Sequence, residues 1–416
     1  MPGTRQSFAS AVPVGSAANE DHMPVPRLHA AGRSAHSGPP DPCLRPGRTQ
    51  LREIVMKIDG IAWRSIQVAD DARTVIIIDQ TCLPHRFVTT ALTTLDDAAH
   101  AIRAMQVRGA PLIGATAAYG MALAMRQDAS DMAMNEAART LLATRPTAVN
   151  LRWAVERVLA RLTPLDRDAR EDEAYDLARE ICDEDAAICE AIGEHGLAIL
   201  REQHEDTGRP VQVMTHCNAG WLATVDWGTA LAPVYKAHDA GIPVHVWVSE
   251  TRPRNQGASL TAWELAGHGV PHTLVVDNAA GHLMRTGRVD MTITGADRVT
   301  ASGDVCNKIG TYLKALAAHR HGLPFYAALP SPTIDWRLMD GDAIPIEERG
   351  GGEVTTVTGC AADGTIAPVA IAPETTMPEN PAFDVTPAEL VTGLITERGL
   401  CDASAGSLAG LFADQA

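Results

Sequence analysis

From residue 209 onward, short apolar runs rich in β-branched residues alternate with helical patterns. This alternation constrains the fold more than any other feature, because it requires a parallel sheet with right-handed crossovers. The predicted strands are 211–215, 244–248, 273–276, 291–294 and 325–329, and the predicted helices are 227–240, 259–267, 281–286 and 308–321. We therefore expect residues 206–416 to form a Rossmann-like parallel-sheet domain, with a last helical piece at 387–398.

The preceding part of the chain has a different pattern. Helical periodicity predicts helices at 95–105, 111–126, 132–143, 150–162 and 171–203, and two short β-branched runs predict strands at 61–63 and 74–80. Residues 56–205 should therefore form a mostly helical N-terminal domain with a small antiparallel β unit. The predicted fold class is α/β, with the mostly helical domain followed by the Rossmann-like one.

Residues 1–55 lack hydrophobic periodicity and hold eight of the chain's 26 prolines. This composition is typical of disorder, so we expect a disordered extension. Two origins are compatible with it: a transit-like segment rich in arginine, or a translation start placed upstream of Met56.

The composition narrows the class of partner. A net charge of −16 argues against a nucleic-acid binder, and no apolar run is long enough for a membrane span. The eight cysteines form no C-x-x-C pair, which argues against a zinc site or a disulfide framework. We expect a cytoplasmic protein that acts on a small molecule.

Polar residues follow each predicted parallel strand. Because parallel strands end at one edge of a sheet, these residues should share one crevice. They are residues 215–218, 249–257, 277–278 and 295–298, with Asn307 and Lys308 a short step further. Polar strand ends are common in α/β folds, so each residue taken alone is equally compatible with a structural role.

Two predicted helix starts are candidate anion sites. Residues 307–310 offer backbone N–H groups and the charge of Lys308, and Arg108, Gly109, Ala110 and Pro111 combine a phosphate donor with close backbone approach. No G-x-G-x-x-G opens the first helix of the parallel domain, so we infer no dinucleotide. The residues themselves indicate a phosphorylated small molecule, with a thiol and a carboxylate nearby.

Eight motifs in order resemble methylthioribose-1-phosphate isomerase, in the superfamily of the regulatory subunits of translation initiation factor 2B. They are residues 108–114 (RGAPLIG), 145–151 (RPTAVNL), 215–220 (THCNAG), 250–253 (ETRP), 256–257 (QG), 295–298 (GADR), 307–311 (NKIGT) and 380–387 (NPAFDVTP). The resemblance runs from about residue 56 to residue 398.

The resemblance implies conversion of the aldose 5-methylthioribose 1-phosphate into the ketose 5-methylthioribulose 1-phosphate, in methionine salvage. It implies that Asp297 donates a proton and that Cys217 stabilises the transition state or carries a proton. Asp297 would then need a pKa raised by apolar surroundings. The implied substrate contacts are Arg108, Gly109, Ala110, Arg145, Gln256, Asn307 and Lys308. No metal or organic cofactor is implied, and the family expectation is a homodimer.

Two alternatives share this fold. A sibling isomerase would act on 5-deoxyribose 1-phosphate or ribose 1,5-bisphosphate, and only the pocket around C5 would differ. A non-catalytic regulatory subunit of the initiation factor would have no need of both Cys217 and Asp297, which stand here in full motif context.

Overall fold

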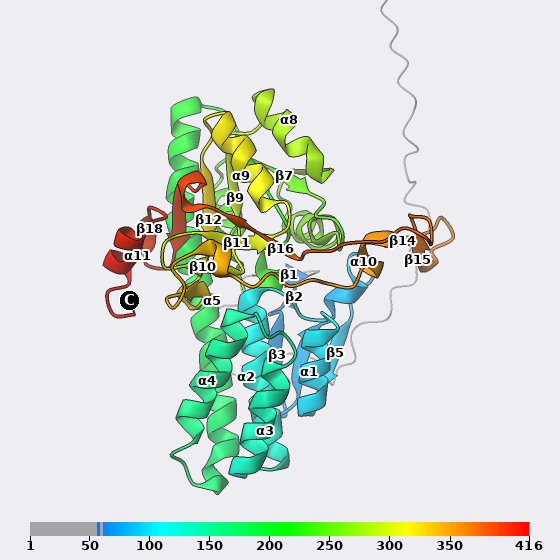
Figure 1. The fold of residues 1–416 in the computed structure, drawn as a ribbon, viewed down its shortest axis with the longest axis vertical. Helices are drawn as coiled ribbons and strands as arrows, with labels where there is room; N and C mark the ends of the chain where they lie inside the picture. The colour runs from blue at the N-terminus through cyan, green and yellow to red at the C-terminus, as the bar shows by residue number, and fades with distance from the viewer. Residues whose placement is uncertain (1–55, 59–60, 416) are drawn as a thin grey trace, which may run out of the picture. The chain divides into compact units, whose positions relative to one another are not determined.

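The C-terminal half of the chain is built on a seven-stranded sheet, seen in a computed structural model that describes residues 56–58 and 61–415 (Figure 1). The extension predicted at 1–55 lies outside the described residues. In spatial order the strands are β18 (Gly399–Cys401), β17 (Gly393–Thr396), β12 (Phe325–Ala328), β9 (Met291–Thr294), β6 (Val211–Thr215), β7 (Val244–Ser249) and β8 (His272–Val275). All neighbours are parallel except β17 and β18. All the strands predicted for this sheet are present.

The order of the parallel strands creates a switch point between β6 and β9. The chain runs outward from β6 through β7 to β8, then returns to β9 on the other side of β6 and runs outward again through β12 to β17. This is the order of doubly wound α/β sheets, which leave a crevice at the carboxyl ends of the two central strands. Cys217 follows β6 and Asp297 follows β9, so both lie at this crevice.

Helices cover both faces of the sheet, and the strand residues alternate between two cores. Val213 and Val246 pack with helices α5, α6 and α7, whereas their neighbours Met214 and Trp247 pack with α8, α9 and α11. These helices are α5 (Arg170–Thr207), α6 (Ala232–Asp239), α7 (Ala262–His268), α8 (Ala280–Arg285), α9 (Thr311–Arg320) and α11 (Ala405–Leu411). Burial on both faces explains why the strands read as continuous apolar runs.

The N-terminal half is mostly helical, with a three-stranded antiparallel sheet. It holds β3 (Ile66–Val68), β4 (Val75–Ile78), β5 (Thr89–Leu92), α1 (Leu95–Arg103), α2 (Ala110–Gln127), α3 (Asp131–Leu142) and α4 (Val149–Leu162), preceded by the pair β1 (Lys57–Ile58) and β2 (Ile61–Ala62). All of residues 112–125 of α2 are buried, so this helix is the centre of the bundle. The long helix α5 leaves the bundle and continues along the sheet (Figure 1). Its Cys182 lies in the bundle core and its Cys189 in the sheet core.

Three predicted helices need correction. The helix predicted at 308–321 begins only at Thr311, because Lys308 ends strand β11 (Val305–Lys308). The helix predicted at 227–240 begins at Ala232, since Trp227 and Gly228 have positive φ angles of 64° and 84°. The helix predicted at 387–398 is wrong, because residues 393–396 pair with β12 as strand β17. Pairing with a distant strand outweighed local propensity there.

A second sheet, not predicted, completes the crevice. Its order is β13 (Ile334–Asp335), β10 (Arg298–Thr300), β11 and β16 (Phe383–Thr386). Between β13 and β16 the chain forms α10 (Gly352–Thr355) and the hairpin of β14 (Thr356–Cys360) and β15 (Ile366–Ala370), which lies away from both sheets in Figure 1. Among the described residues, no helix is long and apolar enough to cross a membrane.

Asp185 joins the long helix α5 to the loop that follows Cys217. Its buried carboxylate accepts a hydrogen bond of 2.7 Å from the backbone N–H of Val225, and the Val225 carbonyl accepts one of 3.1 Å from Ser65. Burial raises the pKa of Asp185 to about 7 from an ordinary value of 3.8. At a pH between these two values, Asp185 keeps its proton in the folded chain and has lost it in the unfolded chain.

We therefore expect the free energy of unfolding to fall as pH rises from about 4 to about 7, by at most about 1.4 kcal/mol per pH unit for this one proton. In Asp185→Asn this contribution to the pH dependence of the free energy of unfolding should disappear. Urea unfolding at pH 5 and pH 7 measures the difference. The matched control is Asp176→Asn, an exposed carboxylate on the same helix, which should keep the wild-type slope. An unchanged slope in Asp185→Asn contradicts the assignment.

Candidate active site

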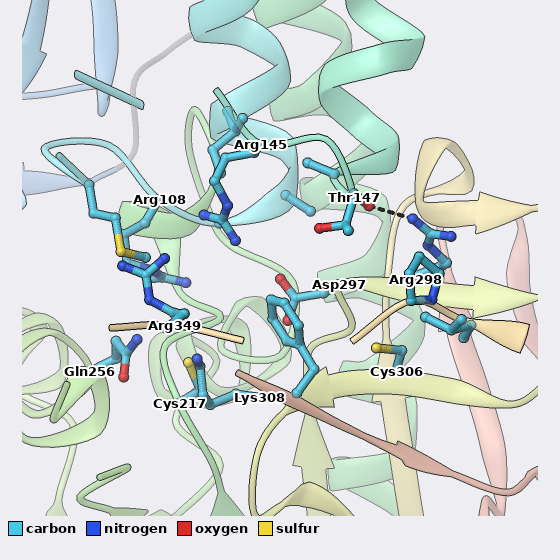
Figure 2. Close-up of a pocket in the computed structure, with 18 residues that line it drawn as sticks. Arg108, Arg145, Thr147, Cys217, Gln256, Asp297, Arg298, Cys306, Lys308 and Arg349 are labelled. Atoms are coloured by element: carbon cyan, nitrogen blue, oxygen red, sulfur yellow. Dashed lines mark hydrogen bonds between the residues drawn. The ribbon is translucent and has the colours of Figure 1, made fainter. Parts of the chain in front are cut away.

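A pocket lies at the switch point, between the helical bundle and the carboxyl ends of β6 and β9 (Figure 2). Its space, together with the part open to solvent, measures about 740 Å³. Its walls combine basic, thiol and carboxyl groups with apolar side chains. The lining residues are Met105, Arg108, Gly109, Ala110, Ile113, Arg145, Thr147, Ala148, Cys217, Gln256, Asp297, Arg298, Cys306, Lys308, Ile344, Pro345, Arg349 and Phe383.

Cys217 stands on a strained turn directly after β6. Its φ of 65° is unusual for a residue with a side chain, and such strain is often kept at functional sites. Its backbone N–H donates to Thr251 Oγ1 at 2.8 Å and its carbonyl accepts from Thr261 Oγ1 at 2.7 Å. Burial raises the pKa of the Cys217 thiol, while Arg108 and Lys308 oppose that rise. The thiol is therefore held in place at the pocket wall, and burial favours its protonated form.

Asp277 holds the loop that fixes Cys217. Its carboxylate accepts from Ser249 Oγ at 2.5 Å, from the Thr251 N–H at 2.8 Å and from the Arg252 N–H at 2.7 Å. Thr251 is thereby locked opposite Cys217, itself with a φ of 66°. Ser249, Thr251 and Asp277 thus act on the site by positioning the backbone after β6.

Asp297 follows β9 on the other side of the switch point. Its backbone N–H donates to the Cys306 carbonyl at 2.9 Å, which fixes the turn into β10. Desolvation raises the pKa of Asp297, although Lys308, Arg108 and Arg145 all favour its charged form. A carboxyl that keeps its proton to higher pH is suited to general acid catalysis.

Lys308 enters the pocket from the end of strand β11. Its ammonium group lies 5.0 Å from the centroid of the Phe383 ring, and its burial lowers its pKa. The neighbouring Asn307 faces a recess that adjoins the pocket, with its Nδ2 donating to Thr311 Oγ1 at 3.0 Å. The structure thus brings Lys308 to the pocket and Asn307 to its edge.

The anion site predicted at the start of α9 is wrong. The backbone N–H groups of Gly310 and Tyr312 donate to the Asp384 carboxylate at 2.7 Å and 3.2 Å, so a side chain already caps this helix. Lys308 therefore acts as a cation on a strand and has no helix end behind it. The prediction failed because β16, which carries Asp384, comes from far along the chain.

The start of α2 forms the opposite wall. Gly109, with a φ of 96°, precedes the helix, and a Cβ there would lie 2.3 Å from the Ala223 carbonyl oxygen. Arg108 donates to Asn218 twice, to Oδ1 and at 2.8 Å to the backbone oxygen. The backbone of Gly109 thus lies close to that of Ala223. This approach places Arg108 and Ala110 beside the loop that carries Cys217.

Gln256 and Arg145 reach the pocket from two further segments. Gln256 precedes a π-helical turn (Gly257–Thr261), and a Cβ on Gly257 would lie 1.7 Å from the Ser249 oxygen. The buried Oε1 of Gln256 has no hydrogen-bond partner among the described residues. Arg145 forms a 2.8 Å ion pair with Glu347. All the predicted site residues therefore line the pocket or the adjoining recess.

Glu264 is a buried carboxylate behind this wall. It accepts from Asn218 Nδ2 at 3.0 Å, from the Leu222 N–H at 2.9 Å and from the Tyr235 hydroxyl at 2.8 Å. Because the Asn218 amide nitrogen is taken up this way, its amide oxygen faces Arg108. Glu264 thus positions Arg108 through Asn218.

Comparison with known proteins identifies the family of the chain. The model of the initiation factor 2 subunit family matches residues 106–403. The methylthioribose-1-phosphate isomerase of Methylorubrum extorquens is 63% identical over 361 residues, which cover 86% of this chain and 99% of the relative. That of Paramagnetospirillum magneticum is 61% identical over 362 residues, covering 87% of this chain and all of the relative. The chain belongs to the methylthioribose-1-phosphate isomerase family.

Two solved structures, one of an isomerase and one of an initiation-factor subunit, are both similar to this chain. The crystal structure of 5-methylthioribose 1-phosphate isomerase from Pyrococcus horikoshii has a TM-score of 0.73 and 37% identity, over 86% of this chain and 97% of that one. A structure described as translation initiation factor eIF-2B, subunit delta, from A. fulgidus has a TM-score of 0.69 and 38% identity, over 84% and 99%. The two likenesses are nearly equal, so the fold alone does not separate an isomerase from the factor.

Several residues of the isomerase-family pocket were not predicted from sequence. Phe383 and Arg349 come from the C-terminal segment, and Met105 and Ile113 from the helical bundle. Arg298, although adjacent to Asp297, had no predicted role; it donates to the Thr147 carbonyl, which ties the sheet to the bundle (Figure 2). A weak signal for Arg349 existed in its spacing of four residues from Glu353, which is typical of a helical ion pair.

Two replacements of Glu264 distinguish the contribution of its hydrogen bonds to stability from that of its charge. In Glu264→Ala three buried donors lose their acceptor, and we expect the free energy of unfolding to fall by about 3 kcal/mol or more. In Glu264→Gln the amide oxygen still accepts from Leu222 and Asn218 while its nitrogen can donate to Tyr235, so the loss should be about 1 kcal/mol or less. Urea unfolding measures both variants, and equal losses would contradict the network.

Proposed function

We propose that this chain converts 5-methylthioribose 1-phosphate into 5-methylthioribulose 1-phosphate, as an aldose–ketose isomerase of methionine salvage. The observation that carries the proposal is the pairing of Cys217 and Asp297, both with raised pKa, across the switch point of a cationic pocket. The names and identities of the curated relatives support it.

The proposed chemistry begins with the ring of the sugar. Because the C1 oxygen carries the phosphate, simple ring opening offers no free aldehyde, and the ring oxygen must be protonated as its bond to C1 breaks. Asp297 is the proposed donor of that proton, for which its raised pKa is suited. One hydrogen then moves from C2 to C1, through a phosphoenolate or as hydride. The C2 hydroxyl gives up its proton as the ketone forms at C2, and this proton restores the acid form of Asp297. No electrons are gained or lost overall, so the balance needs no external oxidant.

The proposed role of Cys217 is to stabilise the transition state or carry a proton at C2. The proposed contacts to substrate are the cations Arg108, Arg145 and Lys308, the close backbone of Gly109 and Ala110, and the amides of Gln256 and Asn307. Dianionic phosphate is well matched to this excess of positive charge, because charge-assisted hydrogen bonds are strong in a site shielded from water.

We also propose that the chain is divided into a mostly helical domain at 56–205 and a Rossmann-like catalytic domain at 206–416, with the pocket between them. The homodimer implied by the family resemblance and the cytoplasmic location expected from the cysteine pattern stay predictions.

The apolar wall of the pocket favours the methylthio sugar over its siblings. Met105, Ile113, Ile344, Pro345 and Phe383 offer a surface for an uncharged thioether. A second phosphate on C5 would lose its hydration against such a surface, so ribose 1,5-bisphosphate is disfavoured. A 5-deoxy sugar would only leave apolar space unfilled, at a cost of about 1–3 kcal/mol.

Asp297→Asn and Cys217→Ser should both fold normally and lose turnover. General acid catalysis contributes roughly 100- to 10,000-fold, so we expect kcat to fall within that range for Asp297→Asn. In the wild type kcat should decline as pH rises through the raised pKa of Asp297, because the proton to be donated is then lost. Cys306→Ser, a second thiol of the same pocket, is the control and should retain most of the turnover. Near-wild-type kcat in either test variant would refute its role.

Turnover of the three candidate sugar phosphates tests the substrate. We expect kcat/KM to be highest for 5-methylthioribose 1-phosphate, roughly 10- to 200-fold lower for 5-deoxyribose 1-phosphate, and lower still for ribose 1,5-bisphosphate. A higher kcat/KM for the bisphosphate would establish the sibling function. No turnover of any of the three would favour the regulatory-subunit alternative.

A further inference from the structure

The segment 344–355, here called the strap, closes one side of the pocket without belonging to either sheet. Three of its residues, Ile344, Pro345 and Arg349, line the pocket. Figure 2 shows Arg349 in the same space as Arg108, Gln256 and Cys217. The motifs quoted from the sequence do not include the strap.

A chain of ion pairs ties the strap to both sides of the pocket. Glu347 pairs with Arg145 at 2.8 Å and with Arg349 at 2.8 Å, so one carboxylate bridges two arginines that line the pocket. Glu353 pairs with Arg349 at 2.7 Å and with Arg254 at 2.9 Å. Arg145 lies between α3 and α4, and Arg254 lies between β7 and the π-helical turn, so the chain spans bundle, strap and sheet.

The donors of Arg349 are only partly used by these carboxylates. Its Nε donates to Glu353 at 3.0 and 3.1 Å, its Nη2 to Glu353 at 2.7 Å and its Nη1 to Glu347 at 2.8 Å. A guanidinium carries five N–H donors, of which two are on each Nη. One N–H on each Nη therefore has no acceptor among the described residues, and these two groups belong to a side chain of the pocket lining.

Arg349 also adds a like charge next to Lys308. Its positive charge helps to lower the pKa of the Lys308 ammonium group, which burial lowers most. Placing two cations together in a buried pocket is unfavourable unless an anion joins them. The two carboxylates behind Arg349 fix its orientation and raise its pKa. In turn, hydrogen bonds from Arg349 and Arg254 hold the pKa of Glu353 at about 2.

We propose that Arg349 is a further substrate-binding residue, whose two remaining N–H groups donate to the phosphate oxygens of the sugar phosphate. Glu347 is then a positioning residue, which holds Arg145 and Arg349 in a common orientation toward one anion. This inference rests on the proposed function for the identity of the substrate, and on the pocket geometry for the binding of an anion.

The alternative role for Arg349 is to hold the strap in place. Other residues already make contacts that hold the strap. Arg254 pairs with Glu353, Arg252 Nη2 donates to the Val354 carbonyl at 2.7 Å, and Asn380 Nδ2 donates to the Gly350 carbonyl at 3.2 Å. Arg254 is the matched control, because it shares the Glu353 carboxylate with Arg349 but does not line the pocket.

The test compares Arg349→Ala, Arg349→Lys and Arg254→Ala in the full chain. We expect Arg349→Ala to raise KM for the sugar phosphate, and Kd for inorganic phosphate in a calorimetric titration, by about 10- to 100-fold, as for a lost charge-assisted hydrogen bond. kcat should change less than KM. Arg349→Lys should recover part of the affinity, since it keeps the charge but loses the planar fork. Arg254→Ala should change KM and Kd less than about twofold while lowering thermal stability comparably to Arg349→Ala.

Equal increases of KM and Kd in Arg349→Ala and Arg254→Ala would overturn the proposal, because Arg349 would then only fasten the strap. If Arg349→Ala does not fold, Arg349→Lys decides: wild-type Kd for inorganic phosphate and wild-type KM would refute donation from the fork. If the wild type turns over no sugar phosphate, the proposed function fails, yet weaker phosphate binding in Arg349→Ala alone would still support Arg349 as an anion-binding residue.

Discussion

The divergence of the chain on either side of β6 and β9 is the constraint on which the site depends. Two adjacent parallel strands whose following segments leave in opposite directions cannot fill the space beyond their carboxyl ends. Cys217 and Asp297 stand at those two ends, so the topology alone brings a thiol and a carboxyl to one crevice although they are distant in sequence. The bundle, the second sheet and the strap then form the walls of that crevice and bury most of the groups that line it.

Two opposed effects act on the pKa of the buried groups Asp297 and Cys217. Desolvation raises the pKa of Asp297 and Cys217, whereas the nearby cations lower it, and desolvation is the larger effect for both. The same balance lowers the pKa of Lys308. Burial thus shifts all three groups toward their uncharged forms, and the neighbouring charges offset part of that shift. A dianionic phosphate would add negative charge to this pocket and raise the pKa of Asp297 further, which would keep its proton available until the ring opens.

An element could be predicted from the sequence when its own residues carry the pattern. It could not be predicted when it depends on a pairing strand far along the chain. The strands of the parallel sheet were predictable because burial on both faces leaves continuous apolar runs, and Cys217 and Asp297 were predictable because they follow such runs directly. Lys308 was placed on a helix because β11 is half polar and gains its partner, β16, from a segment far along the chain. Strand β17 was missed for the same reason. Arg349 has no strand or helix periodicity behind it, and only the folded strap places it at the pocket.

One solved isomerase structure and one solved initiation-factor structure are about equally similar to this chain, so the fold does not decide between their functions. The identity to curated isomerases does decide the family. The pocket of this chain retains features that reduce stability. Cys217 and Thr251 keep positive φ angles, and Asp297 and Lys308 are partly or fully withdrawn from water beside other charges. Each of these costs about 1–3 kcal/mol or shifts a pKa away from its ordinary value. Such strain at a buried crevice fits the proposed role of this site, which is to donate a proton to a sugar phosphate.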